Sequence, residues 1–427
     1  MKKNNINLYI TICIDTEGPL TETLKATFQR LKNSKNIKLK PTFQNLKKLQ
    51  EKKINLNGRE KEIADFVDPK RIKYLSNWSQ VKNMVKKITS KKFRSIFSDT
   101  NKRPLVYNWF IIDTVGYKNN PRKKSIGFHS ILKNYEKILS NTSKDEMGWH
   151  FHTVPANKNA TEYNTCWTNN DWHEQSLCRR LIDKDIFHSV FRAGGLIERN
   201  DLSFWLENFI PFDFSNKSKD PKISKVDTPG KIDDWRRAPY DWSSYNPNFY
   251  DYRVKGTMKR TIFRTLDIDS NSNIISEKEV EKAFKRSRKK KTILSVSCHD
   301  RRDLEPEIRH FMNLVKKVSL KYKDVNWSNE NILNAPRNVL NLKKKKKLFI
   351  MIKKNKNILN IKTNSKIFGP IPFLAIKESN NLYYRDNPTI EGKNEWCYKI
   401  PVEKKIKFVG VAACDDYGNI AKKIIKI

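Results

Sequence analysis

Continuous runs of apolar, β-branched and aromatic residues recur through the first three quarters of the chain, and each run ends in polar residues. Such runs are typical of strands that are buried on both faces of a parallel sheet. The pattern predicts strands at residues 6–14, 104–112, 147–154, 186–192 and 292–298.

Segments with helical spacing separate these runs. Residues 20–49 carry helical spacing with many lysines, and the pattern predicts a helix over 201–209 with Asn200 or Asp201 as its N-cap, and helices over 277–289 and 304–318. Strands that alternate with helices over this length indicate an α/β domain with a parallel sheet, either open or closed into a barrel.

The pattern changes at residues 343–347, which are five consecutive lysines. Beyond them, short alternating segments at 348–352, 358–361, 396–400 and 406–413 predict a small all-β sandwich. We therefore expect a barrel domain over 1–342, a lysine linker over 343–347 and a β-sandwich module over 348–427. Because adjacent lysines repel one another and pack poorly, we expect the two parts to fold independently.

The composition supports a folded protein, since 37% of the 427 residues are hydrophobic. The formal net charge is +40, from 86 Lys and Arg against 46 Asp and Glu. Lysine is far commoner than arginine, and isoleucine and asparagine are abundant, as A+T-rich codon usage would produce. Arginine is the better phosphate ligand. We therefore expect only weak, non-specific binding to nucleic acid.

The six cysteines show no C-x-x-C spacing, which favours reduced and mostly buried thiols. The first apolar stretch is too short for a signal sequence and runs directly into Asp15 and Glu17. No segment reaches the roughly 18 apolar residues that a membrane-spanning helix needs. We expect a cytoplasmic protein without a transmembrane segment.

Two polar clusters at strand ends carry residues that can bind a cation. Asp15 and Glu17 lie two positions apart, so both carboxylates point to the same side, where they can share a proton, bind a cation or simply be solvated in a turn. His150 and His152 have the same spacing and can chelate one metal ion together with a carboxylate from elsewhere. The alternative is a pair of ordinary, partly buried imidazoles.

Two further clusters carry residues that can assist catalysis. Arg192 ends a predicted strand before two glycines, and its guanidinium can pair with a carboxylate. His299 precedes Asp300, whose carboxylate can orient the imidazole and raise its pKa, as suits a general acid. Because the carboxyl ends of parallel strands meet at one face, we expect all four clusters to converge.

The ordered set IDTEGP, GWHFHT, FRAGG and SCHD resembles the polysaccharide deacetylases of the NodB-homology, carbohydrate-esterase type. The stretches IERNDLSFWLENFIPFDFS and DWRRAPYDW resemble an outlying branch associated with surface-polysaccharide gene clusters. The resemblance covers about residues 6–332. It implies a distorted (β/α) barrel that binds a divalent metal ion, usually zinc or cobalt, with zinc expected here.

Carried over residue by residue, the resemblance assigns the metal ion to Glu17, His150 and His152. It makes Asp15 the base that acts on a metal-bound water. The remaining two roles fall to Arg192, as the partner of that base, and to His299, as the acid that protonates the leaving amine.

This chain departs from the family pattern in two places. It has H-x-H where the family usually has H-x-x-x-H, and D-x-E where the family usually has adjacent aspartates or D-x-D. The roles of Asp15 and Glu17 could therefore be exchanged. The interval between the acidic motif at Asp15 and the histidine motif at His150 is also longer than usual in the family, so Asp113 within it could enter the site.

The resemblance implies a metal-dependent hydrolase that removes an acyl group, such as acetyl, from an amino sugar or another C–N amide, with a carbohydrate as substrate. The alternatives are a catalytically inactive barrel that binds a saccharide or a partner protein, and a metal oxygenase, because two histidines and a carboxylate also suit non-heme iron. Tryptophans 149, 167 and 172 could form a platform for a sugar ring or belong to the core. The C-terminal module, with Trp396 and Tyr398, resembles an immunoglobulin-like or fibronectin-like sandwich.

Overall fold

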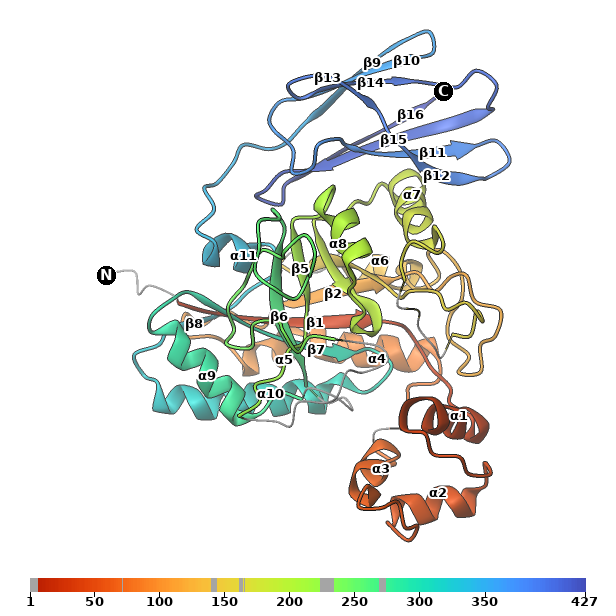
Figure 1. Ribbon diagram of the computed structural model, residues 1–427. Helices are drawn as coiled ribbons and strands as arrows, with labels where there is room; N and C mark the ends of the chain where they lie inside the picture. The colour runs from red at the N-terminus through yellow and green to blue at the C-terminus, as the bar shows by residue number, and fades with distance from the viewer. Residues whose placement is uncertain are drawn as a thin grey trace.

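Seven parallel strands close into a barrel in the computed structural model, which describes residues 7–427 except 71, 140–143, 161–163, 165, 223–233 and 269–273 (Figure 1). The barrel strands are β1 (Leu8–Thr16), β2 (Tyr107–Ile112), β3 (Glu146–Phe151), β4 (Val190–Ala193), β5 (Phe212–Asn216), β6 (Thr261–Asp267) and β7 (Thr292–His299). They follow one another around the barrel in chain order, and β7 pairs with β1 to close it. The expected α/β barrel is therefore present.

One further short strand fills a gap beside β1. The second half of β1 pairs with β2, starting from Ile12 opposite Tyr107. The first half pairs instead with β8 (Trp327–Asn329), from Leu8 opposite Trp327. Because β8 takes up these hydrogen bonds, the edge of β1 is satisfied where β2 has not yet begun.

The side chains of the barrel strands alternate between the interior and the surrounding helices. In β1, the even-numbered Ile10, Ile12 and Ile14 pack in one apolar cluster with the helices, whereas Tyr9 and Cys13 belong to the cluster that fills the barrel. That interior cluster is otherwise made of side chains from the other strands, from the segment that leads into α11 (Asn334–Val339) and from α11 itself, namely Phe110, Val190, Phe212, Phe214, Phe263, Ile293, Ile332 and Ala335. The apolar filling therefore occupies the barrel toward α11.

Helices surround the barrel, and several of them begin at a Thr, Asn, Ser or Asp residue whose side chain caps the helix. Thr23, Thr42, Asn77, Ser276 and Asp303 each accept a backbone N–H at the N-terminus of a helix. The helices are α1 (Leu24–Lys35), α2 (Phe43–Gln50), α3 (Glu60–Phe66), α4 (Trp78–Thr89), α5 (Lys91–Ile96), α6 (Leu132–Leu139), α7 (Trp172–Lys184), α8 (Asn200–Glu207), α9 (Glu277–Ser287), α10 (Leu304–Lys321) and α11 (Asn334–Val339). Helices α1 to α3 have an apolar cluster of their own and project from the barrel (Figure 1).

The C-terminal region is all-β, as expected. Two four-stranded antiparallel sheets, in the orders β13-β14-β10-β9 and β12-β11-β15-β16, face each other across a shared apolar cluster. Their strands are β9 (Ile350–Asn355), β10 (Ile358–Thr363), β11 (Phe373–Glu378), β12 (Tyr383–Asp386), β13 (Thr389–Gly392), β14 (Glu395–Lys399), β15 (Ile406–Cys414) and β16 (Ile420–Lys426). Trp396 and Tyr398 are both buried in this shared cluster.

The two parts of the chain share a core, which argues against independent folding. The lysine run at 343–347 is exposed and belongs to no helix or strand. However, Phe373 and Ala412 from the C-terminal sheets lie in one apolar cluster with Leu181 of α7 and Trp149 of β3. Helix α7 lies against β11 and β12 (Figure 1). We therefore expect the two parts to unfold together.

Several local expectations need correction. The N-cap of α8 is Arg199, which makes no capping bond with its side chain. Asp201 instead accepts the backbone N–H groups of Trp167 and Thr168, at 2.6 and 3.1 Å. Strands β5, β6 and β8 were not among the predicted elements.

The cysteines and the helices of the described residues bear on two other expectations. All six cysteines are free thiols, and four of them are buried. Within the described part of the chain, no helix combines the length and the apolar character needed to cross a membrane.

Candidate active site

The carboxylates of the first cluster lie where β1 leaves the barrel. Asp15 continues the inward-facing positions of β1, pairs in register with His299 of β7, and is only 2% exposed. Glu17 follows it and is 4% exposed. The turn after β1 is held by Asp300, whose carboxylate accepts the backbone N–H groups of Glu17 and Gly18 at 2.8 and 3.0 Å. Asp300, which directly follows β7, therefore fixes the backbone from which the Glu17 side chain projects.

The histidine pair ends β3, next to β4. His150 is an inward-facing residue, and its Nδ1 lies 2.9 Å from the backbone oxygen of Arg192. Because a carbonyl oxygen can only accept, Nδ1 carries the proton and Nε2 of a neutral His150 offers a lone pair. That Nε2 lies 3.0 Å from Nε2 of His152. The two nitrogens that could bind a metal ion therefore face the same point.

A glycine makes room for the second histidine. A Cβ atom at Gly194 would lie 1.9 Å from Cδ2 of His152 and 2.4 Å from the backbone oxygen of Phe151. No side chain could occupy that position without moving the imidazole. The glycine after Arg192 is thus required by the packing of His152.

The three expected metal ligands come together. One ligand atom from each of Glu17, His150 and His152 lies within 4.8 Å of the others, and all three residues are buried. One carboxylate and two imidazoles are donors that zinc and similar divalent ions accept, and a fourth position would stay open for water or substrate. The donor chemistry therefore fits a divalent metal ion, without selecting which one.

Two basic residues that the sequence did not single out hold the far oxygen of Glu17. Arg301 Nη1 lies 2.8 Å and Lys124 Nζ lies 3.2 Å from Glu17 Oε2, while Oε1 lies 3.7 Å from His152 Nε2. Burial by itself would raise the pKa of Glu17, but the charges of Arg301 and Lys124 outweigh burial and hold that pKa well below its ordinary value. Glu17 is therefore ionised at neutral pH.

Asp15 belongs to a buried chain of charged and polar groups. Arg192 Nε donates to both carboxylate oxygens of Asp15, at 2.9 and 3.1 Å, and Nη2 donates to Ser297 Oγ at 2.9 Å. Ser297 Oγ donates to Asp267 at the end of β6, at 2.6 Å, and Asp267 is ion-paired with Lys217. The chain crosses the top of the barrel from β1 to β6 and fixes the position of the Asp15 carboxylate.

His299 faces both carboxylates. Its Nε2 lies 3.7 Å from Asp15 and 3.9 Å from Glu17, and its Nδ1 has no hydrogen-bond partner among the residues that the structure describes. Burial, reinforced by the charge of Arg301, lowers the pKa of His299 well below its ordinary value, so the imidazole is neutral at pH 7.

The expectation that Asp300 orients His299 and raises its pKa is wrong. The Asp300 carboxylate is taken up by the turn after β1 and by the hydroxyl of Tyr135, at 2.5 Å. Burial raises the pKa of Asp300 to about 7, so this carboxyl group is only partly ionised near neutral pH.

No family model and no curated protein matches this sequence. Two solved structures with local similarity are a superoxide reductase from Giardia intestinalis and a tetra-tandem repeat from the extending region of a large adhesion protein. Each is 14% identical over 19% of this chain, and the alignments cover 100% and 23% of those chains, with TM-scores of 0.16 and 0.15. Such low TM-scores carry no argument about this protein.

Asp113 does not join the site. Its carboxylate is held by Arg180 Nε at 2.8 Å, by Ser176 Oγ at 2.6 Å and by the backbone N–H of His129 at 2.7 Å. The ion pair with Arg180 is completely buried, which makes Asp113 part of the framework between β2 and α7. The end of strand β2 therefore supplies a structural carboxylate rather than a metal ligand.

The tryptophans near the histidines are mostly core residues. Trp149 is fully buried and points outward from β3 against Phe191 and Trp205. Trp167 is buried as well, and its Nε1 donates to the backbone oxygen of Ile197. Trp172 packs partly buried against the same cluster. The structure therefore favours the core interpretation over a sugar platform for Trp149 and Trp167.

Some of the residues that sequence reasoning missed had a signal and others had none. Asp267 ends the run TIFRTLD, in which Arg264 and Thr265 interrupt the apolar residues, so this strand lacks the continuous apolar signature of the others. Arg301 directly follows the SCHD motif. Lys124 and Lys217 lie in loops among many other lysines, so no local pattern distinguishes them.

Proposed function

We propose that this protein is a metal-dependent hydrolase that removes an acyl group from the nitrogen of an amino sugar, on a barrel of the polysaccharide-deacetylase type. The observation that carries the proposal is the convergence of Glu17, His150 and His152 at one buried point, with Asp15 and His299 beside it. These side chains come from three separate strand ends, and two histidines with a carboxylate are common ligands of catalytic zinc.

Glu17, His150 and His152 would hold the divalent ion, for which we propose zinc. When bound, such an ion activates water and polarises the acyl carbonyl. The carbonyl of Arg192 keeps His150 in the tautomer that leaves Nε2 available, and Arg301 with Lys124 keeps Glu17 ionised. The surrounding residues therefore prepare all three ligands in the protonation state that metal binding requires.

Asp15 and His299 would move the protons. Asp15 accepts the proton of the attacking water, the carbon–nitrogen bond breaks, and a proton reaches the leaving nitrogen through His299. Because the pKa of His299 is lowered, the imidazole carries this proton only during the reaction. Arg192 Nε donates to both oxygens of the Asp15 carboxylate and so fixes its position. Arg192 therefore acts as a positioning residue.

The test begins with metal. Protein purified without chelator should contain one divalent ion per chain, and His150→Ala should lose it because only two ligands remain. His310→Ala is the matched control, since this exposed histidine lies on α10. Full metal content in His150→Ala would refute the metal site.

The roles of the two carboxylates can then be separated. Asp15→Asn should retain the metal ion and lose acetate release from N-acetylated chito-oligosaccharides, whereas Glu17→Gln should lose both. Glu391→Gln, at an exposed position in β13, is the control. The opposite pattern would mean that Asp15 is the ligand and Glu17 the base.

A second candidate function, a catalytically inactive barrel that binds a saccharide or a partner, is favoured by one observation. The carboxylates are already paired with positive charges in the absence of a metal ion, because Arg301 and Lys124 share one Glu17 oxygen and Arg192 holds Asp15. The absence of bound metal in chelator-free protein, together with no gain in thermal stability on adding zinc, would support this alternative over the hydrolase.

A further inference from the structure

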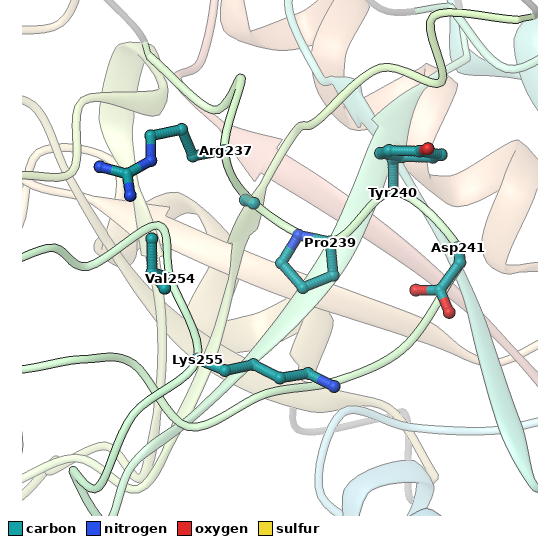
Figure 2. A pocket seen from close by; sticks show the side chains of 7 residues that line it. Arg237, Pro239, Tyr240, Asp241, Val254 and Lys255 are labelled. Atoms are coloured by element: carbon teal, nitrogen blue, oxygen red, sulfur yellow. The ribbon is translucent and has the colours of Figure 1, made fainter.

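The connection between β5 and β6 forms a pocket outside the barrel. Its described residues, 217–222 and 234–260, contain no helix. Two of its segments border an open hollow of about 560 Å³, and Figure 2 shows Pro239 in the middle of the other side chains. The pocket is lined by Arg237, Ala238, Pro239, Tyr240, Asp241, Val254 and Lys255. This volume is within the range of about 300–1,000 Å³ that small-molecule sites occupy.

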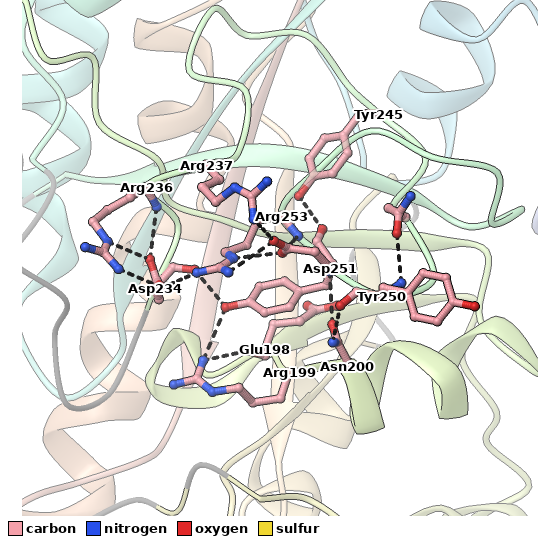
Figure 3. Close-up of polar contacts among 12 residues, drawn as sticks. Glu198, Arg199, Asn200, Asp234, Arg236, Arg237, Tyr245, Tyr250, Asp251 and Arg253 are labelled. Carbon is pink, nitrogen blue, oxygen red and sulfur yellow. Dashed lines mark hydrogen bonds and ion pairs between the residues drawn. The ribbon is translucent and has the colours of Figure 1, made fainter.

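The two walls of the pocket are clamped to each other, as Figure 3 shows. Arg237 Nη1 donates to Asp251 Oδ2 at 2.6 Å, and Arg253 Nε donates to Asp251 Oδ1 at 2.8 Å. Arg253 also pairs with Asp234, which holds Arg236 at 3.0 Å. These contacts join the wall that contains residues 234–241 to the wall that contains residues 251–255. The pocket is therefore formed before any ligand arrives.

The pocket is also anchored to the edge of the barrel that carries the candidate active site. The backbone oxygen of Pro239 accepts from Asn216 Nδ2 at 2.9 Å and from Ser218 Oγ at 2.6 Å. Asn216 is the last residue of β5, and Lys217 between these two residues belongs to the polar chain that ends at Asp15. The pocket therefore lies beside the C-terminal end of β5, on the side where the site residues emerge.

The charges around the pocket favour an anion. Among the residues that the structure describes here, three arginines, at 236, 237 and 253, share two aspartates, at 234 and 251, which leaves one positive charge. Lys255 adds a second, because it forms no ion pair with any residue in the described ranges and is exposed. Asp241 is compensated by Arg286, 3.1 Å away. A carboxylate or phosphate would balance this excess.

The remaining surface of the pocket suits a ring with both polar and apolar faces. Pro239 and Val254 give an apolar floor, and Tyr240 is 37% exposed. Lys282 Nζ lies 4.4 Å from the centre of the Tyr240 ring and is itself paired with Asp220, which holds the ring in place. Flat apolar surfaces with charged groups at the rim are what a sugar ring needs for stacking and hydrogen bonding.

We propose that this pocket binds a sugar unit that carries a carboxylate or a phosphate. The anionic character follows from the charges of the pocket alone, whereas the choice of a sugar rests on the proposed function. Lys255 contacts the anionic group and Tyr240 contacts the ring. The protein thus recognises an acidic or phosphorylated saccharide at a place separate from the metal ligands.

The experiment uses the full chain carrying Asp15→Asn, kept in chelator so that neither metal nor turnover contributes. Four probes are titrated by calorimetry: N-acetylglucosamine 1-phosphate, glucuronic acid, neutral N-acetylglucosamine and inorganic phosphate. We expect at least one charged sugar to bind more tightly than the neutral sugar and more tightly than inorganic phosphate. Which of the two binds distinguishes a phosphorylated from a carboxylated ligand.

Two variants and a control assign the binding to the pocket. Lys255→Gln should weaken the charged sugar about tenfold, because one charge-assisted hydrogen bond is lost. Tyr240→Leu should weaken the sugars but leave inorganic phosphate unchanged. Lys423→Gln removes the same charge from an exposed position on β16 and should have no effect.

Four outcomes would overturn the inference. These are a neutral sugar that binds as tightly as both charged sugars, inorganic phosphate that binds as tightly as both charged sugars, no binding of any probe, or binding of the charged sugar that Lys255→Gln leaves unchanged. Because no metal is present, none of these results bears on the proposed hydrolase, whose failure would be seen in the metal content of the His150→Ala comparison.

Discussion

Replacing Gly194 by alanine should displace His152 and weaken metal binding without changing any ligand. The new Cβ would lie 1.9 Å from Cδ2 of His152, and ordinary contact begins at 3.4 Å, so the imidazole or the loop must move by about 1.5 Å. Metal ligands tolerate errors of only about 0.2 Å in distance. We therefore expect zinc affinity to fall by about 10–100-fold or more, and the free energy of unfolding to fall by about 1–3 kcal/mol.

Competition of the protein with a chromophoric zinc chelator measures the first quantity, and urea denaturation of the metal-free protein measures the second. Gly392→Ala is the matched control, because the nearest atom to its new Cβ is a Glu395 carboxylate oxygen at 4.0 Å. If Gly194→Ala bound zinc and unfolded like the unmodified protein, His152 would not pack against this glycine, and the arrangement of the three ligands around one point would be refuted. A loss of stability with unchanged zinc affinity would show that His152 is not a ligand.

Three further predictions concern the rest of the molecule. Burial alone would raise the pKa of Asp183, but His129, Tyr383 and Lys377 outweigh it and lower that pKa to about 2; because solvent screens this half-exposed group, the resulting stabilisation should be about 1 kcal/mol or less, be present above about pH 4 and be lost as the pH falls toward 2, which unfolding curves of Asp183→Asn across this range would check. Phe373→Ala should cost about 3–5 kcal/mol and lower the stability of the whole chain, and a chain ending at residue 342 should be insoluble; a soluble, cooperatively folded 1–342 fragment would contradict the shared core. A DNA duplex should bind with a dissociation constant weaker than about 1 µM at physiological salt and without sequence preference, as fluorescence anisotropy would show, and tight selective binding would overturn our interpretation of the net charge.

The sequence by itself determined the strands that carry the candidate site. Five of the seven barrel strands could be located because a strand buried on both faces must be apolar throughout, and this constraint is visible in any short window of residues. The polar residues at the ends of these apolar runs, Asp15, His150, Arg192 and His299, can also be recognised from a short window of sequence. The general rule that carboxyl ends of parallel strands meet at one face then predicted that these residues would converge.

Tertiary structure alone decided which groups surround those residues. Arg301 and Lys124 reach Glu17 from different loops, and Asp300 turns away from its neighbour His299 to hold the turn after β1. Asp113, which ends a buried strand in the same way as Asp15, is taken up by Arg180 of α7. The sequence spacing of a carboxylate says where it lies on its own strand but not which cation from another segment will neutralise it.

The relation between the barrel and the C-terminal sheets was also decided only by packing. The lysine run marks a change of pattern correctly, but whether two parts share a core depends on which apolar faces remain uncovered once each has folded. Phe373 and Leu181 come together because α7 presents an apolar side to β11. Apolar periodicity shows that a face must be buried, and it carries no information about the partner, because the hydrophobic effect has no direction.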